Sequence, residues 1–104
     1  MEFWKLLTGL QGKILKTLAQ GRTFEVLHVG QSEVIIVPHR TMKPRHIPMK
    51  EIEGSYQKLK AIGQITRVEI EAEYSPRDPA YVASILAALP GVRHNLKTII
   101  TLEL

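Results

Sequence analysis

The sequence predicts an α+β protein, a small antiparallel β-meander of four to five strands packed against two or three helices. Residues 13–47 hold short stretches with β-branched or alternating side chains, and glycine-containing breaks separate these stretches. From residue 48 onward, apolar residues recur instead at helical spacing. The chain of 104 residues has the usual length of one domain and shows no repeat or long linker, so we assign residues 1–104 to a single domain.

The first half predicts a short helix over residues 2–9, followed by strands. Three strands are expected at residues 13–18, 23–29 and 33–38, and the breaks AQGR and GQS between them contain the glycine that tight turns favour. In the second strand, alternation places Phe24, Val26 and His28 on one face. A fourth strand at residues 45–47 would follow the loop PHRTMKPRH and complete a meander, which a curl could turn into a small open barrel.

The second half predicts two clear helices and a closing strand. The first helix follows Pro48 and ends at Gly63, and its apolar side chains share one face: Ile52, Tyr56, Leu59 and Ile62. Gly54 within this helix indicates a close contact between helix and sheet. The last helix covers residues 78–89, with Asp78 as its N-cap and an apolar stripe: Val82, Ile85, Leu86 and Leu89. The tail LKTIITLEL, residues 96–104, alternates as a strand does.

Residues 66–74 show a helical and an extended pattern at once. Thr66 followed three residues later by Glu69 is a capping box, which marks the start of a helix. The alternation of apolar and charged residues in RVEIEAEY is typical of a strand with an acidic outer face. We favour the helix, because its glutamates would lie near the positive end of the helix dipole. An edge strand is the alternative.

Several functional classes find no support in the composition. The chain contains no cysteine, which excludes disulfides and cysteine-ligated metals and suits a cytoplasmic protein. Its most apolar run, residues 80–89, is half of the roughly 20 residues that a membrane span needs, so we expect no membrane attachment. A phosphate-binding glycine loop, a nucleophile motif and a zinc-like histidine spacing are all missing. We therefore expect no catalytic residue, no metal and no cofactor.

Positive charge concentrates in the first half. Residues 1–50 hold eight Lys and Arg against three acidic residues, whereas residues 51–104 hold six against seven. The acid-free stretch 34–50 contains every residue that we predict to contact nucleic acid: His39, Arg40, Lys43, Arg45, His46 and Lys50. Cations on a protruding loop suit phosphate contacts, so we predict binding to nucleic acid, duplex DNA above all, with weak sequence preference. Lys13, Lys16 and Arg22 would extend the patch if they lay on the same side. The alternative is a solvated hairpin loop.

The order of elements from residue 49 to residue 104 resembles the winged helix-turn-helix arrangement of DNA-binding proteins. The stretch reads as a helix, the turn IGQIT, a short capped helix, the turn EYSPRD, a third helix and a strand. This resemblance implies that the third helix reads DNA bases, which requires outward Arg, Lys, Asn or Gln side chains. The residues beside its apolar stripe are instead small: Ala80, Ala83, Ser84, Ala87 and Ala88. We therefore place the nucleic-acid contacts on the basic loop.

A protein-interaction or regulatory module is the alternative function. The small residues of helix 78–89 would allow close approach of a partner protein or of a second copy of the chain. The acidic residues 69–73 and the basic residues 39–50 would complement each other in a homodimer.

Overall fold

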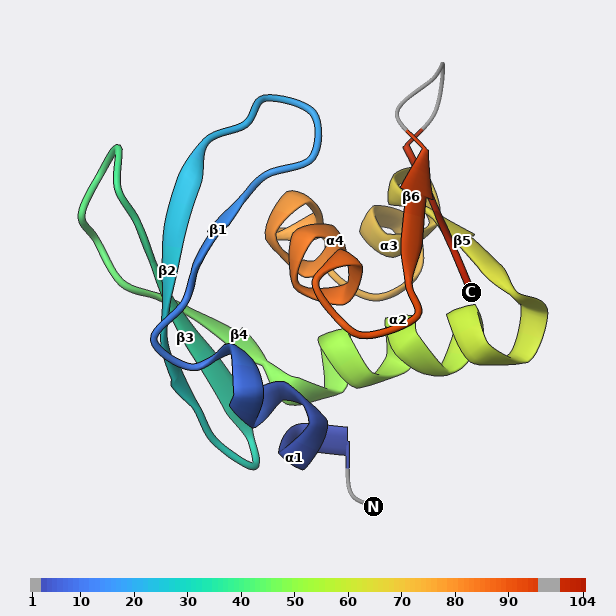
Figure 1. The fold of residues 1–104 in the computed structure, drawn as a ribbon, viewed down its shortest axis with the longest axis horizontal. Coiled ribbons are helices and arrows are strands. Elements are labelled where there is room, and N and C mark those ends of the chain that lie inside the picture. The colour runs from blue at the N-terminus through green and yellow to red at the C-terminus, as the bar shows by residue number, and fades with distance from the viewer. Residues whose placement is uncertain (1–2, 96–99) are drawn as a thin grey trace.

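The computed structural model describes residues 3–95 and 100–104. Within these residues, two antiparallel sheets flank a central helix, and further helices pack below and behind it (Figure 1). The α+β class predicted from the sequence is confirmed.

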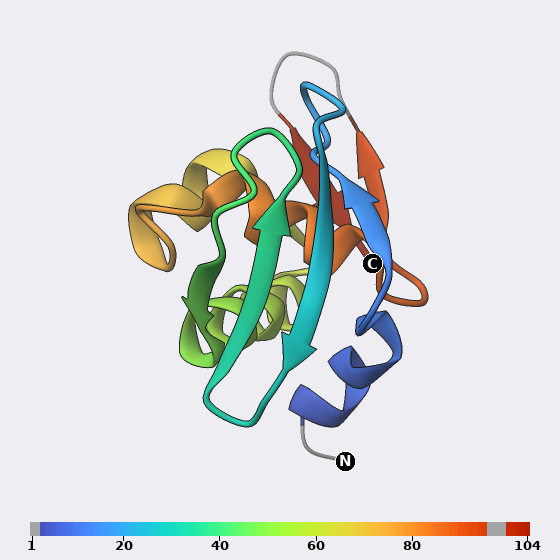
Figure 2. The ribbon, with the colours of Figure 1, turned by 90° about the vertical axis from the view of Figure 1, so that its left-hand side faces the viewer.

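The first sheet is the predicted meander, with its strands in the order β1-β2-β3-β4 (Figure 2). Its strands are β1 (Ile14–Lys16), β2 (Thr23–Val29), β3 (Glu33–Pro38) and β4 (Arg45–Pro48). The bounds of β2 and β3 agree with the prediction, while β1 is shorter and β4 one residue longer. Since β1 and β4 pair with one neighbour each, the sheet is open and does not close into a barrel.

A β-bulge changes which residues of β2 face the core. The pairing with β3 shifts between Val26 and His28, and both Leu27 and His28 are exposed. Val29 is buried again beyond the shift. The predicted grouping of His28 with Phe24 and Val26 is therefore wrong, because the extra residue of a bulge reverses the alternation that follows it.

The N-terminal segment covers one end of the core. It forms α1 (Phe3–Leu7) and a 3₁₀ turn (Thr8–Leu10), in agreement with the short helix predicted there. Leu7 is fully buried, and the ring of Phe3 lies 4.8 Å from the ring of Tyr56 in the next helix. This contact holds α1 against α2.

The second half alternates helices with very short strands. Its elements are α2 (Met49–Ile62), β5 (Gln64–Thr66), α3 (Arg67–Glu73), α4 (Pro79–Ala87), β6 (Arg93–Asn95) and β7 (Thr101–Glu103). The three strands form a second antiparallel sheet in the order β5-β7-β6. β7 confirms part of the predicted closing strand, whose residues 96–99 lie outside the described residues, whereas β5 and β6 were not predicted.

The helical interpretation of residues 66–74 is confirmed. The hydroxyl of Thr66 accepts a hydrogen bond from the backbone N–H of Glu69 at 3.1 Å, and the Glu69 carboxylate accepts one from the backbone N–H of Thr66 at 3.1 Å. These two hydrogen bonds satisfy two N–H groups at the start of the helix. They favour the helix over the strand that the alternation of residues indicates. The preceding helix ends as predicted, with Gly63 in the left-handed conformation at φ 91°.

Gly54 makes its close contact with a different partner than predicted. A Cβ atom at this position would lie 2.9 Å from Cδ1 of Tyr74, the residue that ends α3. The contact therefore joins α2 to the end of α3, and the predicted approach of helix to sheet at this glycine is wrong. Any side chain at position 54 would have to displace the tyrosine ring.

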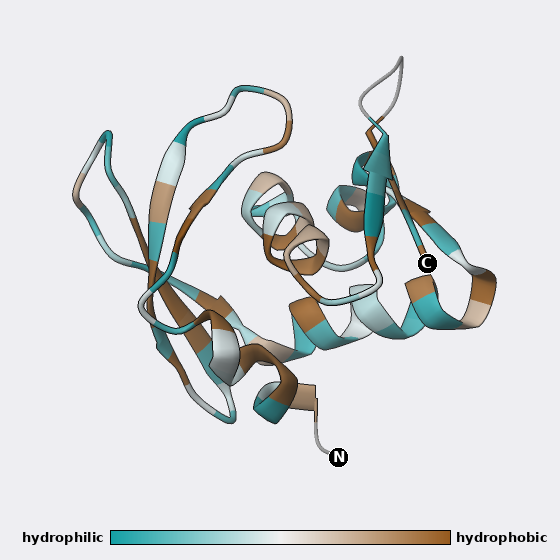
Figure 3. Ribbon diagram, viewed as in Figure 1, coloured by the Kyte–Doolittle hydropathy of each residue, from teal (hydrophilic) through white to brown (hydrophobic). Residues whose placement is uncertain are grey.

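α4 is the central element of the fold, and the chain itself covers most of its surface. Six of its nine residues are buried, namely Pro79, Val82, Ala83, Ser84, Ile85 and Leu86. The predicted apolar stripe is confirmed, but Ala83 and Ser84, expected beside it, are also buried. Small side chains here allow close packing within the chain, so this helix offers little free surface to a partner. Figure 3 shows the contrast between its hydrophobic residues and the hydrophilic β3–β4 loop.

Candidate nucleic-acid interface

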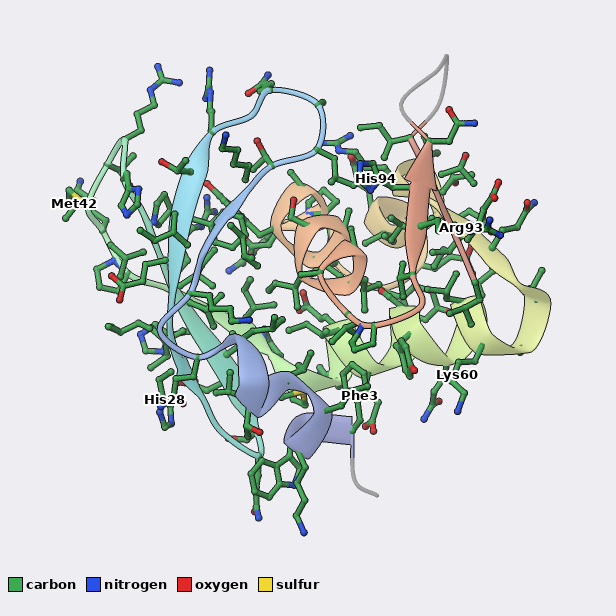
Figure 4. All side chains as sticks on the ribbon, viewed as in Figure 1. Phe3, His28, Met42, Lys60, Arg93 and His94 are labelled. Atoms are coloured by element: carbon green, nitrogen blue, oxygen red, sulfur yellow. The ribbon has the colours of Figure 1, made fainter. Side chains whose placement is uncertain are left out.

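The β3–β4 loop, residues 39–44, protrudes from one end of the first sheet (Figure 2). Met42 adopts a positive φ of 57° and donates its backbone N–H to the carbonyl oxygen of Pro38 at 2.8 Å, which closes a tight turn. Its side chain lies on the outer side of the loop (Figure 4) and is 65% exposed. Arg40 and Lys43 are exposed in the same loop, and their side chains form no ion pair with a described residue. Both cations are therefore available to a ligand.

Arg45, also predicted to contact nucleic acid, contacts the start of α4 instead. Its Nε lies 3.0 Å from Oδ1 of Asp78, and its guanidinium lies 5.5 Å from the ring centre of Tyr81 in α4. The Asp78 side chain is only 8% exposed, and burial raises the pKa of its carboxyl, an effect that the positive charge of Arg45 opposes. The contact is ionic, because Oδ1 of Asp78 accepts no hydrogen bond from the described residues. Arg45 thus fastens β4 to α4.

Asp78 has the predicted position in the sequence but a different role. It precedes Pro79 at the start of α4, yet its side chain makes no capping hydrogen bond with the helix. The carboxylate is used for Arg45 instead. A sequence motif identifies the N-cap position, whereas the partner of the side chain depends on which strand lies beside the helix.

The two predicted histidines each have a partner on the first sheet. His46 Nδ1 lies 2.8 Å from Oε2 of Glu33, and His39 Nδ1 lies 2.7 Å from Oγ1 of Thr23. All four atoms belong to the exposed side of the sheet, so both rings remain accessible to solvent. His46 is engaged by an acid, while His39 contacts only a hydroxyl group.

Lys50 lies away from the loop. It belongs to the first turn of α2, and the preceding residue, Met49, donates its backbone N–H to the carbonyl oxygen of Ser32 at 2.8 Å. Ser32 is in the β2–β3 turn, at the opposite end of the sheet from the β3–β4 loop. The structure therefore divides the predicted set, with Arg40, Lys43 and His39 at one end and Lys50 near the other.

Cations from the first hairpin join the loop at the same end. Lys16 pairs with Thr23 in the sheet register, Arg22 precedes Thr23, and Thr23 bonds to His39. Lys13 does not join them, since its carbonyl accepts from Val26 farther along β2. We call the resulting surface the hairpin end. It consists of Lys16, Arg22, His39, Arg40 and Lys43, and none of its Lys or Arg side chains pairs with an acid among the described residues.

A cleft lies beside the hairpin end and was not foreseen from the sequence. It has a volume of about 370 Å³ and separates the β1–β2 loop, residues 17–22, from α4. Arg22 and Arg67 line it from two different elements, and none of the lining residues that the structure describes is acidic. Arg22 was a candidate extension of the basic patch, but nothing in the sequence connects it to Arg67, which only the fold brings near.

The acidic segment of α3 is neutralised within the chain. Nζ of Lys58 lies 2.6 Å from Oε2 of Glu69 and 2.8 Å from Oε2 of Glu73, and Arg67 lies 3.6 Å from Glu71. The two carboxylates raise the pKa of Lys58, and the hydrogen bond from Lys58 lowers the pKa of Glu69. We call this set of five side chains the α2–α3 brace. Its glutamates are engaged, which weakens the predicted pairing with basic residues of a second chain.

Within residues 3–95 and 100–104, no three His, Asp or Glu side chains gather as a metal site would require, and Figure 4 shows His28 and His94 on opposite sides of the molecule. None of the described helices has the length and apolar character required to cross a bilayer.

Comparison of the chain with protein-family models, with curated proteins and with solved structures gave no match. The resemblance of residues 49–104 to winged helix-turn-helix proteins is therefore one of element order alone, and no family membership follows from it. The functional conclusion has to rest on the chain's own surface.

Proposed function

We propose that the protein is a non-enzymatic nucleic-acid-binding domain, which contacts the phosphate backbone of duplex DNA through its hairpin end. One observation carries the proposal. Lys16, Arg22, Arg40 and Lys43 gather at one end of the sheet, and they lack acidic partners among the described residues. Unpaired cations on protruding turns can approach phosphates and release the counterions condensed on DNA.

The type of contact favours weak sequence preference. Phosphate contacts fix the position of a protein on the duplex but do not distinguish base pairs. Base reading needs a helix or strand whose outward side chains reach into a groove, and α4 is largely buried in its own fold. The resemblance to winged-helix proteins would place α4 in a DNA groove, but the burial of α4 argues against DNA reading by that helix.

A docking function for residues 78–89 is less well supported. Most of α4 is buried against its own chain, and Lys58 and Arg67 already engage the acidic residues of α3. The hairpin end, in contrast, carries four cations that have no acidic partner among the described residues.

Salt dependence tests the proposal. If four cations contact phosphates, the logarithm of the affinity should fall by roughly 3.6 per tenfold increase in salt, which weakens binding about 150-fold between 50 and 200 mM. Fluorescence anisotropy with a labelled duplex measures this slope. Replacing both Arg40 and Lys43 with Ser should remove two phosphate contacts. The magnitude of the slope should therefore decrease by about 1.8, because each lost contact removes roughly 0.9.

A matched control separates this surface from net charge. The double change of Lys60→Ser and Arg93→Ser also removes two positive charges, and Figure 4 shows both residues on the side of the molecule away from Met42. The slope of this control should stay close to that of the unmodified protein. Equal losses in both double variants would show that total charge, and not the hairpin end, governs binding, and would overturn the proposal.

A further inference from the structure

We propose that the cleft between the β1–β2 loop and α4 binds a nucleotide through a terminal phosphate monoester, held between Arg22 and Arg67. The nucleotide has two possible sources, a free mononucleotide or the phosphorylated end of a nucleic-acid strand. Only the second source rests on the proposed function.

The charges around the cleft favour an anion. Among the described residues that line it, Arg22 and Arg67 are the two charged ones, and none is acidic. Arg22 has no ion pair with a described residue, and the one acidic partner of Arg67 is Glu71, at 3.6 Å on the same helix. This separation is longer than the contacts of Lys58 in the α2–α3 brace, at 2.6 and 2.8 Å. An exposed pair of this kind is weak and can yield to a ligand.

Both arginines extend from a fixed backbone. The neck of the β1–β2 loop is closed by Thr17, whose N–H donates to the carbonyl of Arg22 at 2.9 Å and whose hydroxyl accepts from the N–H of Arg22 at 3.0 Å. Gly21 adopts a positive φ of 65° within this loop, as its turn requires. On the other side, the N–H of Arg67 donates to the carbonyl of Ile100 at 2.9 Å. Such pre-organisation reduces the entropy that ligand binding would cost.

The cleft also has an apolar wall suited to a sugar and base. The lining includes the aliphatic residues Leu18, Ala83 and Ile100 and the aromatic residue Tyr81. The Tyr81 ring is held on two sides, by an edge-to-face contact with Phe24 at 5.1 Å and by the guanidinium of Arg45. A volume of about 370 Å³ lies in the range of pockets that hold small ligands, roughly 300 to 1,000 Å³.

The number of arginines favours a terminal phosphate over an internal one. A phosphate monoester carries about −1.5 to −2 charges at neutral pH and exposes three oxygen atoms, whereas a phosphodiester carries one negative charge. Two guanidinium groups can balance the monoester, and each can bind its oxygens with two parallel hydrogen bonds. The cleft would therefore distinguish a phosphorylated strand end from the uninterrupted backbone.

Titration with AMP tests the site directly. In amide NMR spectra, AMP should shift signals of the β1–β2 loop, of Arg67 and of the first two turns of α4, while adenosine should bind more weakly. Arg22→Met and Arg67→Met keep the aliphatic stems but remove the charges, and each should weaken AMP binding by about tenfold. Arg40→Ser with Lys43→Ser is the matched control, which should leave AMP binding unchanged. Thermal melts of every variant establish that it is folded, and Arg67→Lys provides a milder change if Arg67→Met unfolds.

Oligonucleotides separate the two sources. A gain in affinity from a 5′-phosphate over a 5′-hydroxyl, lost in Arg67→Met, identifies a strand end as the ligand. AMP binding without that gain identifies a free mononucleotide. Equal binding of AMP and adenosine, or AMP binding that ignores both methionine changes, would overturn the site. Loss of AMP binding in Arg67→Met with an unchanged salt slope on duplex DNA leaves the proposed function standing, because Arg67 lies outside the hairpin end. AMP binding without duplex binding rejects that function alone.

Discussion

The hairpin end and the α2–α3 brace both contain clustered charges but use them in opposite ways. In the brace, Lys58 is 17% exposed and contacts two glutamates, and Arg67 contacts a third. In the hairpin end, Lys16, Arg22, Arg40 and Lys43 find no acid among the described residues. Charges that are paired within a fold contribute to its cohesion, whereas unpaired ones remain available for a partner. The pairing pattern therefore separates Lys58 from the cations of the hairpin end better than net charge does, while Arg67, whose ion pair is longer at 3.6 Å, lies between the two groups.

Arg45 has features of both groups of cations. It adjoins the β3–β4 loop in sequence, yet it shares a buried carboxylate and an aromatic ring with α4. Its neighbours Arg40 and Lys43 have neither contact, which makes the three residues a natural test of the comparison.

The largest effect is expected for Arg45→Ala. Removing the guanidinium leaves Asp78 buried without its partner, which should lower the free energy of unfolding by about 1–3 kcal/mol at pH 7. Burial already raises the pKa of Asp78 above its ordinary value of 3.8, so Asp78 takes up a proton at a higher pH in the folded state than in the unfolded state. The cost should therefore shrink as the pH falls through that pKa. Urea denaturation at neutral and acidic pH measures both quantities.

The control for this change is Arg40→Ala, which removes the same side chain from the adjacent loop. It should leave stability nearly unchanged at both pH values. The double change Arg45→Ala with Asp78→Asn should recover part of the loss, because it removes the buried charge. Equal destabilisation by Arg45→Ala and Arg40→Ala would contradict the structural role that we assign to Arg45 alone of the two arginines.

A smaller effect is expected for Lys58→Met in the brace. Because Lys58 lowers the pKa of Glu69 below its ordinary value of 4.5, their contact stabilises the fold above that pH. The contribution is lost as the pH falls through the lowered pKa of Glu69 in the folded state. The thermal midpoint of Lys58→Met should thus lie below that of the unmodified protein at pH 7, and the two should converge in acid.

Lys60→Met, on the same helix, is the control for Lys58, since Lys60 has no acidic partner among the described residues. It should alter the midpoint less and show no convergence with pH. The difference in thermal midpoint between Lys58→Met and the unmodified protein could instead stay constant from pH 7 into acid. That result would mean that packing of the lysine stem, and not its charge, holds α2 to α3.

The smallest effect on stability is expected for Arg40→Ser combined with Lys43→Ser. Exposed side chains without partners contribute little to the fold, so the free energy of unfolding should change by less than about 0.5 kcal/mol. Chemical denaturation of the same sample that is used for DNA titration provides the measurement. A decrease in the free energy of unfolding of more than about 1 kcal/mol would show that the loop cations support the fold. It would then be wrong to contrast them with the cations of the α2–α3 brace.

Local signals predicted much of the fold. The bounds of β2 and β3, the capping box at Thr66 and the helix end at Gly63 follow from residues close together in the chain, and the structure contains each of them. β5 and β6 have three residues each, too few for a periodic pattern, and only their pairing with β7 defines them. The bulge in β2 likewise depends on its partner strand.

The site was predictable only in part for a related reason. Arg40 and Lys43 lie in a tight, acid-free turn, where exposure follows from position. In β4, Arg45 lies on the same face of the sheet as the buried Ile47, and His46 lies on the other face. Counting charges in the sequence does not reveal this arrangement, because it depends on the register of β4 against β3. Arg22 and Arg67 belong to segments that are far apart in the chain and meet only in the folded protein. Long-range pairing therefore limits what sequence patterns can identify.

The position of β7 in the middle of the second sheet has a consequence for the order of folding. β7 pairs with both β5 and β6, and α3, α4 and β6 separate it from β5 along the chain. The β1–β4 meander, in contrast, joins only neighbours in sequence. Contacts between distant segments form slowly, because a long loop must close first. The meander can thus assemble early, while Leu102 reaches its fully buried place only when the rest of the molecule has gathered around it.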